Sequence, residues 1–457
     1  MVSAESFWTN SLHNSPHGEA ITRVLAAAIQ AVEPGRVVER AVKRDADDLV
    51  ISRRTYDLST FGNVYLLALG KASLPMAESM TQILGDSLTS GLVITKHLPA
   101  GFKSRGLSKV IKGRSSVIQG GHPLPNDRSL VAGKRVIQFL SRLTADDLLV
   151  CLISGGGSAL MAAPLPGVSL SDLQAVTAEL LKCGAAIEEI NALRRRLDLL
   201  KGGGMIRMAN QATVVSLILS DVIGNPLESI ASGPTAPDPT SRDEALAVVK
   251  KYALQAILPA EILISLENSL ETPKPDDPVF EKVHNLVVGS NLSAAQAALR
   301  QAAGEGFHPY LLRTDLKGEA RQAAFELSTF LRQAKKSNAP VPAPACMVAG
   351  GETTVSLQGN GRGGRNTELA LAAVSELADF PEVMLVSLAT DGEDGPTDTA
   401  GAVVTGRSFR RAAELGLNPG PYLQTNDSYT FFDALDDLLK PGPTGTNVND
   451  LVFLFTF

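Results

Sequence analysis

Short, continuous apolar runs that alternate with helical patterns constrain the fold of this chain more than any other feature. The first run, residues 64–69 (VYLLAL), is closed by Gly70 and followed by a helical pattern over residues 71–84. Similar runs come at residues 91–95, 116–118, 148–153 and 213–219. Strands that are apolar throughout must be buried on both faces, so the alternation predicts a parallel sheet with helices on either side.

Chain length and one proline-rich segment indicate two domains. The 457 residues exceed the roughly 250–300 at which single cores stop growing. A helical stripe over residues 18–32 leads into the first core, and residues 271–278 (ETPKPDDP) interrupt the alternation as a linker would. Apolar runs resume at residues 286–288, 309–312, 346–348, 354–357, 383–388 and 451–455. We predict one α/β domain over residues 1–270 and another over residues 280–457, with ligands bound in a cleft between them.

Charge, cysteine usage and hydropathy exclude several classes of partner. The net charge of −6 argues against a nucleic-acid partner, which would favour a basic face. Three widely spaced cysteines are typical of reduced thiols in a cytoplasmic protein. No stretch reaches the roughly 18 apolar residues of a membrane span, and the first ten residues lack the pattern of a secretory signal. We therefore expect a cytoplasmic protein with small-molecule ligands and neither a nucleic-acid nor a membrane partner; its oligomeric state stays open.

A glycine-rich segment directly after the run at 148–153 is the clearest local signal. It consists of Ser154, Gly155, Gly156, Gly157 and Ser158. Glycines allow a ligand to approach bare backbone N–H groups, and Ser158 in the helix cap would face an anion. The pattern therefore predicts a phosphate-binding loop for a nucleotide cofactor, although a plain tight turn into a helix has the same spelling.

Lys71 follows the first strand at the edge where a parallel sheet binds ligands. A lysine at this position can neutralise a phosphate or polarise a substrate oxygen. A solvated lysine at a helix end is the alternative. A GxxxxGK[ST] loop occurs nowhere in the sequence, so any ATP site is built without a P-loop.

The loop over residues 359–364 (GNGRGG) matches GxGxxG and precedes a helical pattern, which admits a dinucleotide-binding interpretation. Two arginines, Arg362 and Arg365, suit a loop that grips a transferring phosphoryl group through bidentate hydrogen bonds. A flexible exposed hairpin is a third interpretation.

Acidic residues and one histidine complete the candidate set. Asp391, in an acidic turn after the run at 383–388, is a candidate Mg²⁺ ligand, unless that turn is merely solvated. Asp221 ends another strand, where it could bind metal, accept a hydroxyl proton or cap a helix. His122, in a loop stiffened by two prolines, is a candidate ligand-binding residue or a structural histidine.

Eight segments, in this order, resemble the glycerate kinases that carry the MOFRL domain. They are ALGKA, GGHPLPN, SGGGSALM, SDVIGNPLESIASGPTAPDPT, GGETTVSLQGNGRGGRNTELALA, ATDGEDGPTDTAGAVV, NDSYTFF and GPTGTNVNDL. The similarity extends from about residue 69 to residue 451. The resemblance implies a Rossmann-like, doubly wound N-terminal domain, a smaller α/β C-terminal domain, ATP and Mg²⁺ as cofactors, D-glycerate as acceptor and 2-phosphoglycerate as product.

The resemblance also implies residue roles. The family's catalytic lysine falls on Lys71, its catalytic arginine on Arg365, and Asp221 matches its substrate-side aspartate. The remaining predicted substrate-binding residues are His122, Glu352, Asn366 and Asp391.

Four positions depart from the family pattern, and they bear on the acceptor preference rather than on the reaction class. They are Asn126, Gly204, Thr367 and Glu393. The runner-up activity is an NAD(P)H-dependent hydroxypyruvate reductase, which the spelling of the GNGRGG loop would suit.

Overall fold

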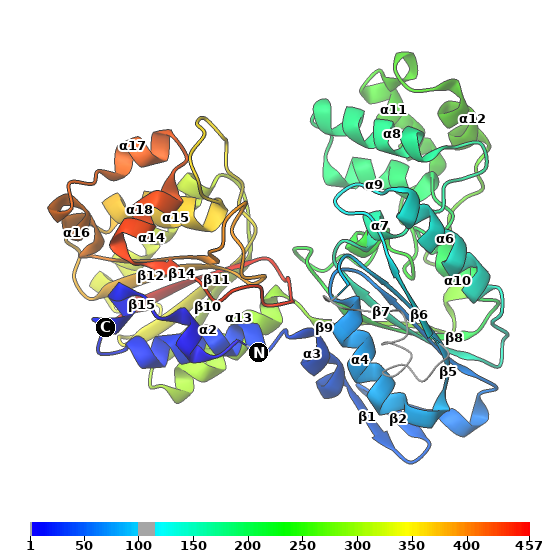
Figure 1. The fold of residues 1–457 in the computed structure, drawn as a ribbon, viewed down its shortest axis with the longest axis horizontal. Helices are drawn as coiled ribbons and strands as arrows, with labels where there is room; N and C mark the ends of the chain where they lie inside the picture. The colour runs from blue at the N-terminus through cyan, green and yellow to red at the C-terminus, as the bar shows by residue number, and fades with distance from the viewer. Residues whose placement is uncertain (1, 99–114) are drawn as a thin grey trace. The chain divides into compact units, whose positions relative to one another are not determined.

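The computed structural model describes residues 2–98 and 115–457, which form two compact units (Figure 1). The central unit is Pro34–Val288. The terminal unit combines Gly289–Phe457 with the N-terminal segment up to Glu33. Each unit contains its own six-stranded sheet with helices on both faces, so the predicted pair of α/β domains is confirmed.

The sheet of the central unit has the strand order β6-β5-β4-β7-β8-β9. Its strands are β4 (Val64–Leu69), β5 (Leu88–Thr95), β6 (Ser115–Gln119), β7 (Leu148–Ser154), β8 (Thr213–Leu219) and β9 (Val283–Gly289). Pairing from β6 through β8 is parallel. Counted from β4, the order is 3-2-1-4-5-6, the order of the Rossmann fold, as predicted.

Helices cover the central sheet because its inner strands are predominantly apolar; every residue of β4 and β7 is buried. On one face lie α3 (Pro34–Ala41) and α4 (Ser73–Leu84), and on the other α6 (Asp127–Leu140) and α10 (Gly204–Met208) (Figure 1). α6 begins after Asn126, whose side chain accepts hydrogen bonds from the backbone N–H groups of Arg128 and Ser129. Asn126, one of the four departures from the family pattern, is therefore the N-cap of α6.

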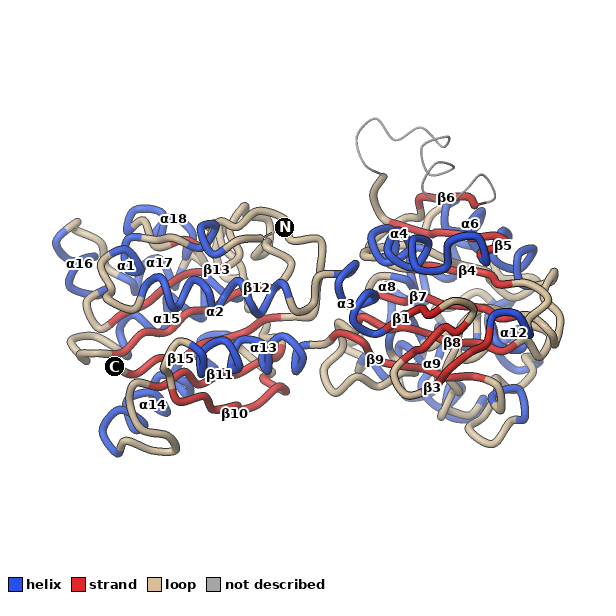
Figure 2. Tube along the Cα trace, turned by 90° about the horizontal axis from the view of Figure 1, so that it is seen from below, coloured by secondary structure: helices blue, strands red, loops and turns tan. Residues whose placement is uncertain are grey.

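A separate group of helices extends this unit beyond the sheet. It comprises α8 (Leu170–Lys182), α9 (Ile187–Arg196), α11 (Arg242–Lys251) and α12 (Ala260–Asn268), which share an apolar cluster around Leu180, Leu193 and Ile262. A small antiparallel sheet, β1 (Val42–Asp45), β2 (Asp48–Ile51) and β3 (Arg54–Asp57), follows α3 (Figure 2).

The terminal unit has the strand order β10-β11-β15-β12-β13-β14. Its strands are β10 (His308–Leu316), β11 (Ala345–Gly351), β12 (Val383–Ala389), β13 (Gly401–Thr405), β14 (Leu438–Leu439) and β15 (Asp450–Thr456). Only the pair β10–β11 is parallel. β15 inserts between β11 and β12 and runs antiparallel to both. The restart of the β-α alternation did not indicate this, since an apolar run carries no information on strand direction.

Two helix layers sandwich this second sheet. One contains α2 (Gly18–Gln30) beside α13 (Asn291–Gly304), and the other contains α14 (Ala320–Ser337) and α15 (Arg365–Glu376) (Figures 1 and 2). The remaining helices of the unit are α1 (Asn10–His13), α16 (Ser408–Glu414), α17 (Pro419–Gln424) and α18 (Ser428–Leu435).

The ends of the units differ from the predicted domain limits. The sequence predicts that the N-terminal segment belongs to the first domain. In the structure the apolar face of α2 packs on α13, and Ser11 donates hydrogen bonds to Asp437 from its backbone N–H (2.7 Å) and its hydroxyl (2.8 Å). The run at residues 286–288 is part of β9 and belongs to the first sheet rather than the second.

Two further elements also differ from the prediction. Residues 354–357 form no strand; Thr354 makes an isolated bridge with Glu319. The predicted linker at 271–278 is part of the central unit, because Glu271 pairs with buried Arg196 and the Pro273 carbonyl accepts from the Asp238 N–H (2.9 Å). Polar anchoring, which proline content does not reveal, holds this segment in place.

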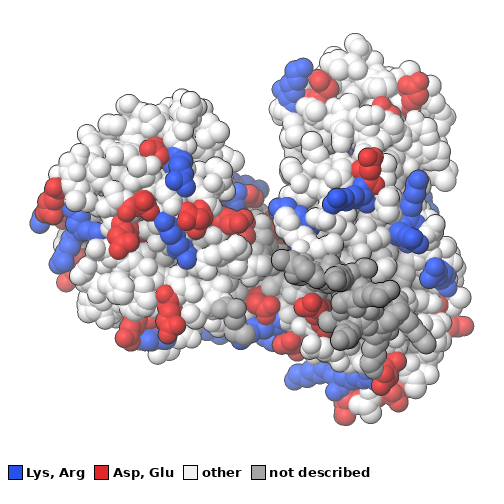
Figure 3. Space-filling view, viewed as in Figure 1, with Lys and Arg blue, Asp and Glu red and all other residues white. Residues whose placement is uncertain are grey.

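Acidic and basic side chains are interspersed over the face of the molecule shown in Figure 3. Within residues 2–98 and 115–457, no helix has the length and apolarity needed to cross a membrane.

Candidate active site

The candidate site in the central unit lies where the strand order reverses, between β4 and β7. Loops at such a point run in opposite directions and leave a crevice at the carboxyl ends of the strands. The Lys71 N–H donates to the Gly155 carbonyl (2.9 Å), and the Ala72 N–H donates to Ser154 Oγ (3.0 Å). The predicted lysine and the predicted glycine-rich loop are therefore joined directly.

The glycines allow three predicted side chains to surround this loop. A β-carbon at Gly155 would lie 1.8 Å from Asp221 Oδ2. At Gly156, where φ is +80°, a β-carbon would lie 3.0 Å from Lys71 Cγ and 3.1 Å from His122 Cδ2. Residues from the loops after β4, β6 and β8 thus meet around the loop after β7, because all four strands end at the same edge.

Ser158 does not cap the following helix, contrary to the prediction. α7 (Gly157–Leu160) is only four residues long, and its N-cap is Gly156. The Ser158 hydroxyl instead lies 2.9 Å from the hydroxyl of Ser232. With glycine at the N-cap, the backbone N–H groups at the start of α7 are not occupied by a capping side chain.

His122 is half-buried, and its pKa is lowered to about 4. Burial is the largest cause, and the positive charges of Lys71, Lys96 and His97 act in the same direction. The imidazole is therefore neutral near pH 7, so that it offers one hydrogen-bond donor and one acceptor and adds no positive charge to the site.

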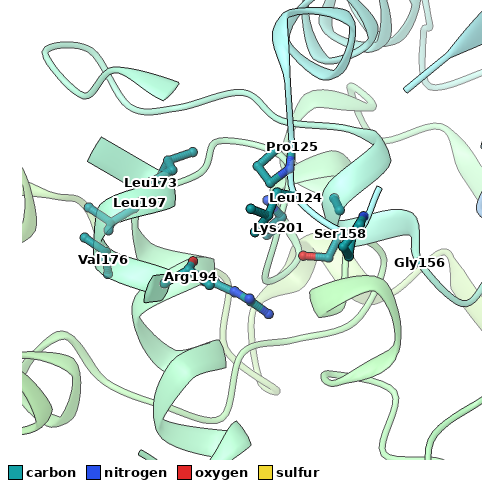
Figure 4. A pocket seen from close by; sticks show the side chains of 12 residues that line it. Leu124, Pro125, Gly156, Ser158, Leu173, Val176, Arg194, Leu197 and Lys201 are labelled. Atoms are coloured by element: carbon teal, nitrogen blue, oxygen red, sulfur yellow. The ribbon is translucent and has the colours of Figure 1, made fainter. Parts of the chain in front are cut away.

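A cavity of about 190 Å³ opens beside the glycine-rich loop (Figure 4). One wall is formed by Gly156, Ser158 and the prolines of the His122 loop, and the other by side chains of α8 and α9. Two basic residues that sequence reasoning did not assign to any site, Arg194 and Lys201, line it as well.

The candidate site in the terminal unit is built around Arg365, the first residue of α15. Its guanidinium donates to both carboxylate oxygens of Asp450 (2.5 and 3.2 Å) and to Glu352 Oε1 (2.7 Å). Asp450 is buried, and this burial raises the pKa of its carboxyl to about 6 although Arg365 opposes the rise. The predicted Arg365 and Glu352 are in contact, whereas Asp450 was not predicted.

Asp394 is a second residue that sequence reasoning missed. Its carboxylate accepts from the backbone N–H groups of Asn366 (2.9 Å) and Thr367 (2.8 Å), and from the Thr367 hydroxyl (2.7 Å). These bonds satisfy N–H groups at the start of α15 and hold the helix end that carries Arg365. The acidic turn after β12 contains both Asp391 and Asp394, and the residue types alone do not distinguish between them.

The other predicted residues of this unit have structural partners. Asn366 is 2% exposed, and its Oδ1 accepts from the Ser387 hydroxyl (2.7 Å). Asp391 Oδ1 accepts from the Glu393 N–H (3.2 Å). Arg362, the other arginine of the GNGRGG loop, lies over the ring of Tyr429 at 4.2 Å from its centroid.

The two predicted metal ligands, Asp221 and Asp391, belong to different units. Among residues 2–98 and 115–457, no three acidic, histidine or cysteine side chains form a group that could hold a metal ion. Isolated carboxylates of this kind fit Mg²⁺ that is bound mainly by substrate phosphates and water, and they do not form an all-protein cage.

Comparison with known proteins identifies the family. A domain of unknown function (DUF4147) matches residues 20–267, and the MOFRL family matches residues 345–450. The chain is 38% identical to a glycerate 2-kinase from Pyrococcus horikoshii over 94% of this chain and 95% of that protein. It belongs to the glycerate kinase family.

Other members of this family agree with the assignment. A D-glycerate 2-kinase from Thermotoga maritima is 38% identical over 94% of this chain and 96% of its own length. The crystal structure of a glycerate kinase from the same organism superposes with a TM-score of 0.84 at 34% identity, covering 95% of this chain and 98% of that one. The resemblance seen in the eight sequence segments and the predicted fold class are both confirmed.

Proposed function

We propose that this glycerate kinase family member transfers the γ-phosphoryl group of ATP to the 2-hydroxyl of D-glycerate, giving 2-phosphoglycerate and ADP. The observation that carries the proposal is the hydrogen bond that joins Lys71 to the glycine-rich loop at the Rossmann switch point. The chain that contains this pair of loops is 38% identical to a D-glycerate 2-kinase. A lysine beside open backbone N–H groups at a sheet edge is suited to binding phosphate.

Each proposed residue has a role in positioning or charge. Lys71 and Arg365 neutralise the negative charge that spreads over the transferred phosphoryl group. Asp221 accepts the proton of the attacking hydroxyl, and the loop from Ser154 to Ser158 binds nucleotide phosphates. Lys71 belongs to the central unit and Arg365 to the terminal unit, so the proposed reaction requires one cation from each unit.

Mg²⁺ bound with ATP would neutralise phosphate charge, with Asp221 and Asp391 as its proposed protein ligands. His122 and Glu352 are proposed to contact the acceptor, and Glu352 is exposed and already orients Arg365. Asn366, which the sequence also assigns to the acceptor, is buried and bonded to Ser387, so its proposed role is to position the start of α15. A cytoplasmic location is part of the proposal, and the free cysteines Cys151, Cys183 and Cys346 agree with a reducing compartment.

The test is ADP release by purified protein with Mg²⁺, ATP and D-glycerate, alongside Lys71→Ala. We expect glycerate-dependent ADP release and a loss of at least about 100-fold in kcat for the variant, because one electrostatic donor is removed from the transition state. Phosphate on the 2-carbon of the product, seen by ³¹P NMR, completes the assignment. Absence of glycerate-dependent ADP release from the folded wild-type protein would refute the proposal.

The reductase alternative is tested in parallel with NADH and hydroxypyruvate. In a dinucleotide-binding Rossmann unit the glycine fingerprint lies in the first strand-turn-helix, which here is the turn from β4 to α4 with the sequence LGKAS. The GNGRGG loop belongs to the terminal unit, where the Gly361 N–H donates to the Thr425 carbonyl (2.9 Å). These positions favour the kinase over the reductase.

A further inference from the structure

The only dense basic run of the sequence, Arg194 to Arg196, ends α9, and two of its three members are neutralised. Arg195 Nε lies 2.8 Å from Asp238 Oδ1, with both side chains buried. Arg196 pairs with Glu271 and is also buried. These two arginines anchor α9 to the segments that pack around it.

Arg194 is different. Among residues 2–98 and 115–457, no carboxylate lies within ion-pair distance of its guanidinium, and the side chain makes no hydrogen bond. It is half-buried, and burial alone lowers its pKa. A cation taken out of water without a partner costs several kcal/mol in general, so this side chain is stabilised if an anion binds beside it.

Arg194 extends into the 190 Å³ cavity beside the glycine-rich loop, between the apolar side chains of α8 and the loop bearing Ser158 (Figure 4). Among the described residues, no acidic side chain lines this cavity. The other lining cation, Lys201, is already bonded to Asp198 Oδ2 (2.8 Å). Arg194 is therefore the lining cation that is left to pair with a ligand.

Cavity size restricts what this ligand is. Sites for drug-sized ligands occupy roughly 300–1,000 Å³, so a cavity of about 190 Å³ is too small for a whole nucleoside triphosphate. It suits an anion of a few non-hydrogen atoms. Three lining side chains, Leu173, Val176 and Leu197, offer an apolar wall to a short carbon chain, and the opposite wall carries Gly156 and Ser158 of the proposed phosphate loop.

We propose that this cavity is the acceptor site and that Arg194 binds the carboxylate of the hydroxy acid. The inference rests on the proposed function. With the carboxylate at Arg194, the hydroxyl end of the acceptor faces the glycine-rich loop, around which Lys71, His122 and Asp221 gather. Nucleotide phosphates reach only the edge of the cavity. Arg194 is thus the determinant of specificity for carboxylates over neutral polyols.

The experiment compares glycerate with glyceramide, in which a neutral amide replaces the carboxylate, in wild-type protein, Arg194→Met and Arg194→Lys. For glycerate we expect the KM of Arg194→Met to rise about 30-fold or more, because a charge-assisted bidentate hydrogen bond is lost. The KM for ATP should change less than about threefold, since the nucleotide lies outside the cavity. Arg194→Lys should recover part of the loss because its charge remains.

The decisive readout is the ratio of kcat/KM for glycerate to that for glyceramide. Wild-type protein should prefer glycerate by about 30-fold or more, and Arg194→Met should lose most of this preference; a purely structural role would weaken both substrates equally. Arg207→Met, an exposed arginine on α10, is the control and should keep the preference.

The outcomes separate this inference from the proposed function. If wild-type protein releases ADP with glycerate but Arg194→Met keeps both KM and preference, the inference is wrong and the kinase stands. If wild-type protein uses glycerate and glyceramide equally well, recognition of the carboxylate is refuted. This comparison needs only the wild-type protein, so it holds even if the variants fail to fold. If wild-type protein releases no glycerate-dependent ADP, the proposed function fails first.

Discussion

Two arginines, one in each unit, have opposite electrostatic surroundings. Arg365 in the terminal unit is held by Asp450 and Glu352, and its helix end is held in turn by Asp394. Arg194 in the central unit lines a cavity and has no carboxylate beside it among the described residues. Both side chains are only partly exposed, so both depend on a counter-charge for their stability.

The difference suggests two kinds of function for a half-buried cation. A guanidinium with protein carboxylates on two sides is positioned before any ligand arrives, which suits a group that must meet charge developing in a transition state. A guanidinium without a protein partner is stabilised by the ligand itself, which suits recognition of a ground-state anion. The predictions below test this contrast, beginning with the largest expected effect.

Arg365→Ala should lower kcat by about 1,000-fold or more, because an arginine that neutralises a transferred phosphoryl group contributes on that order. KM for glycerate should change far less, in contrast to Arg194→Met. Steady-state kinetics with both substrates varied measures the two effects. The control is Arg410→Ala, which removes an exposed guanidinium paired with Asp379 in the same unit and should leave kcat within about twofold, as expected of a surface ion pair. A kcat near the wild-type value in Arg365→Ala would break the contrast.

Stability without ligand should respond to the two arginines in opposite directions. Arg365→Met leaves the buried Asp450 without its cation and should reduce the free energy of unfolding by about 3 kcal/mol. Arg194→Met removes a cation that has no partner and should raise it, by about 1 kcal/mol. Urea unfolding of both variants in the same buffer provides the measurement. Equal losses in the two variants would mean that Arg194 has a structural partner after all.

The pH dependence of stability should expose Asp450. Its pKa is raised from 3.8 to about 6 in the folded protein, chiefly by burial. The folded state therefore binds the carboxyl proton more tightly than the unfolded state does. The resulting stabilisation of the fold is fully present below about pH 4 and is lost as the pH rises through about 6. Relative to Asp450→Asn, wild-type protein should lose about 2 kcal/mol of unfolding free energy over that interval. Parallel stability profiles for the two proteins would refute the assignment.

Much of the central unit could be predicted from residue order alone. Apolar runs predicted β4, β7 and β8 almost to the residue, because strands buried on both faces tolerate only apolar side chains. Parallel strands end at one edge, so the meeting of Lys71, Asp221 and the glycine-rich loop followed from their positions after strands.

The terminal unit was harder to predict. An apolar run has no direction, so the antiparallel insertion of β15, which brings its first residue Asp450 beside the ends of β11 and β12, was not foreseen. The packing of α2 on α13 joins segments from opposite ends of the chain, and a helical stripe does not specify which core it will cover.

The sequence by itself determined the apolar strands of the central unit, the glycine-rich loop after β7 and the family, since these depend on local spacing and on motifs in register. Only the tertiary structure decided which charges are neutralised. Arg194, Arg195 and Arg196 are identical in side-chain chemistry and adjacent in sequence, but successive helix positions point about 100° apart and meet different surroundings. Two of them therefore meet carboxylates, and the third faces a cavity.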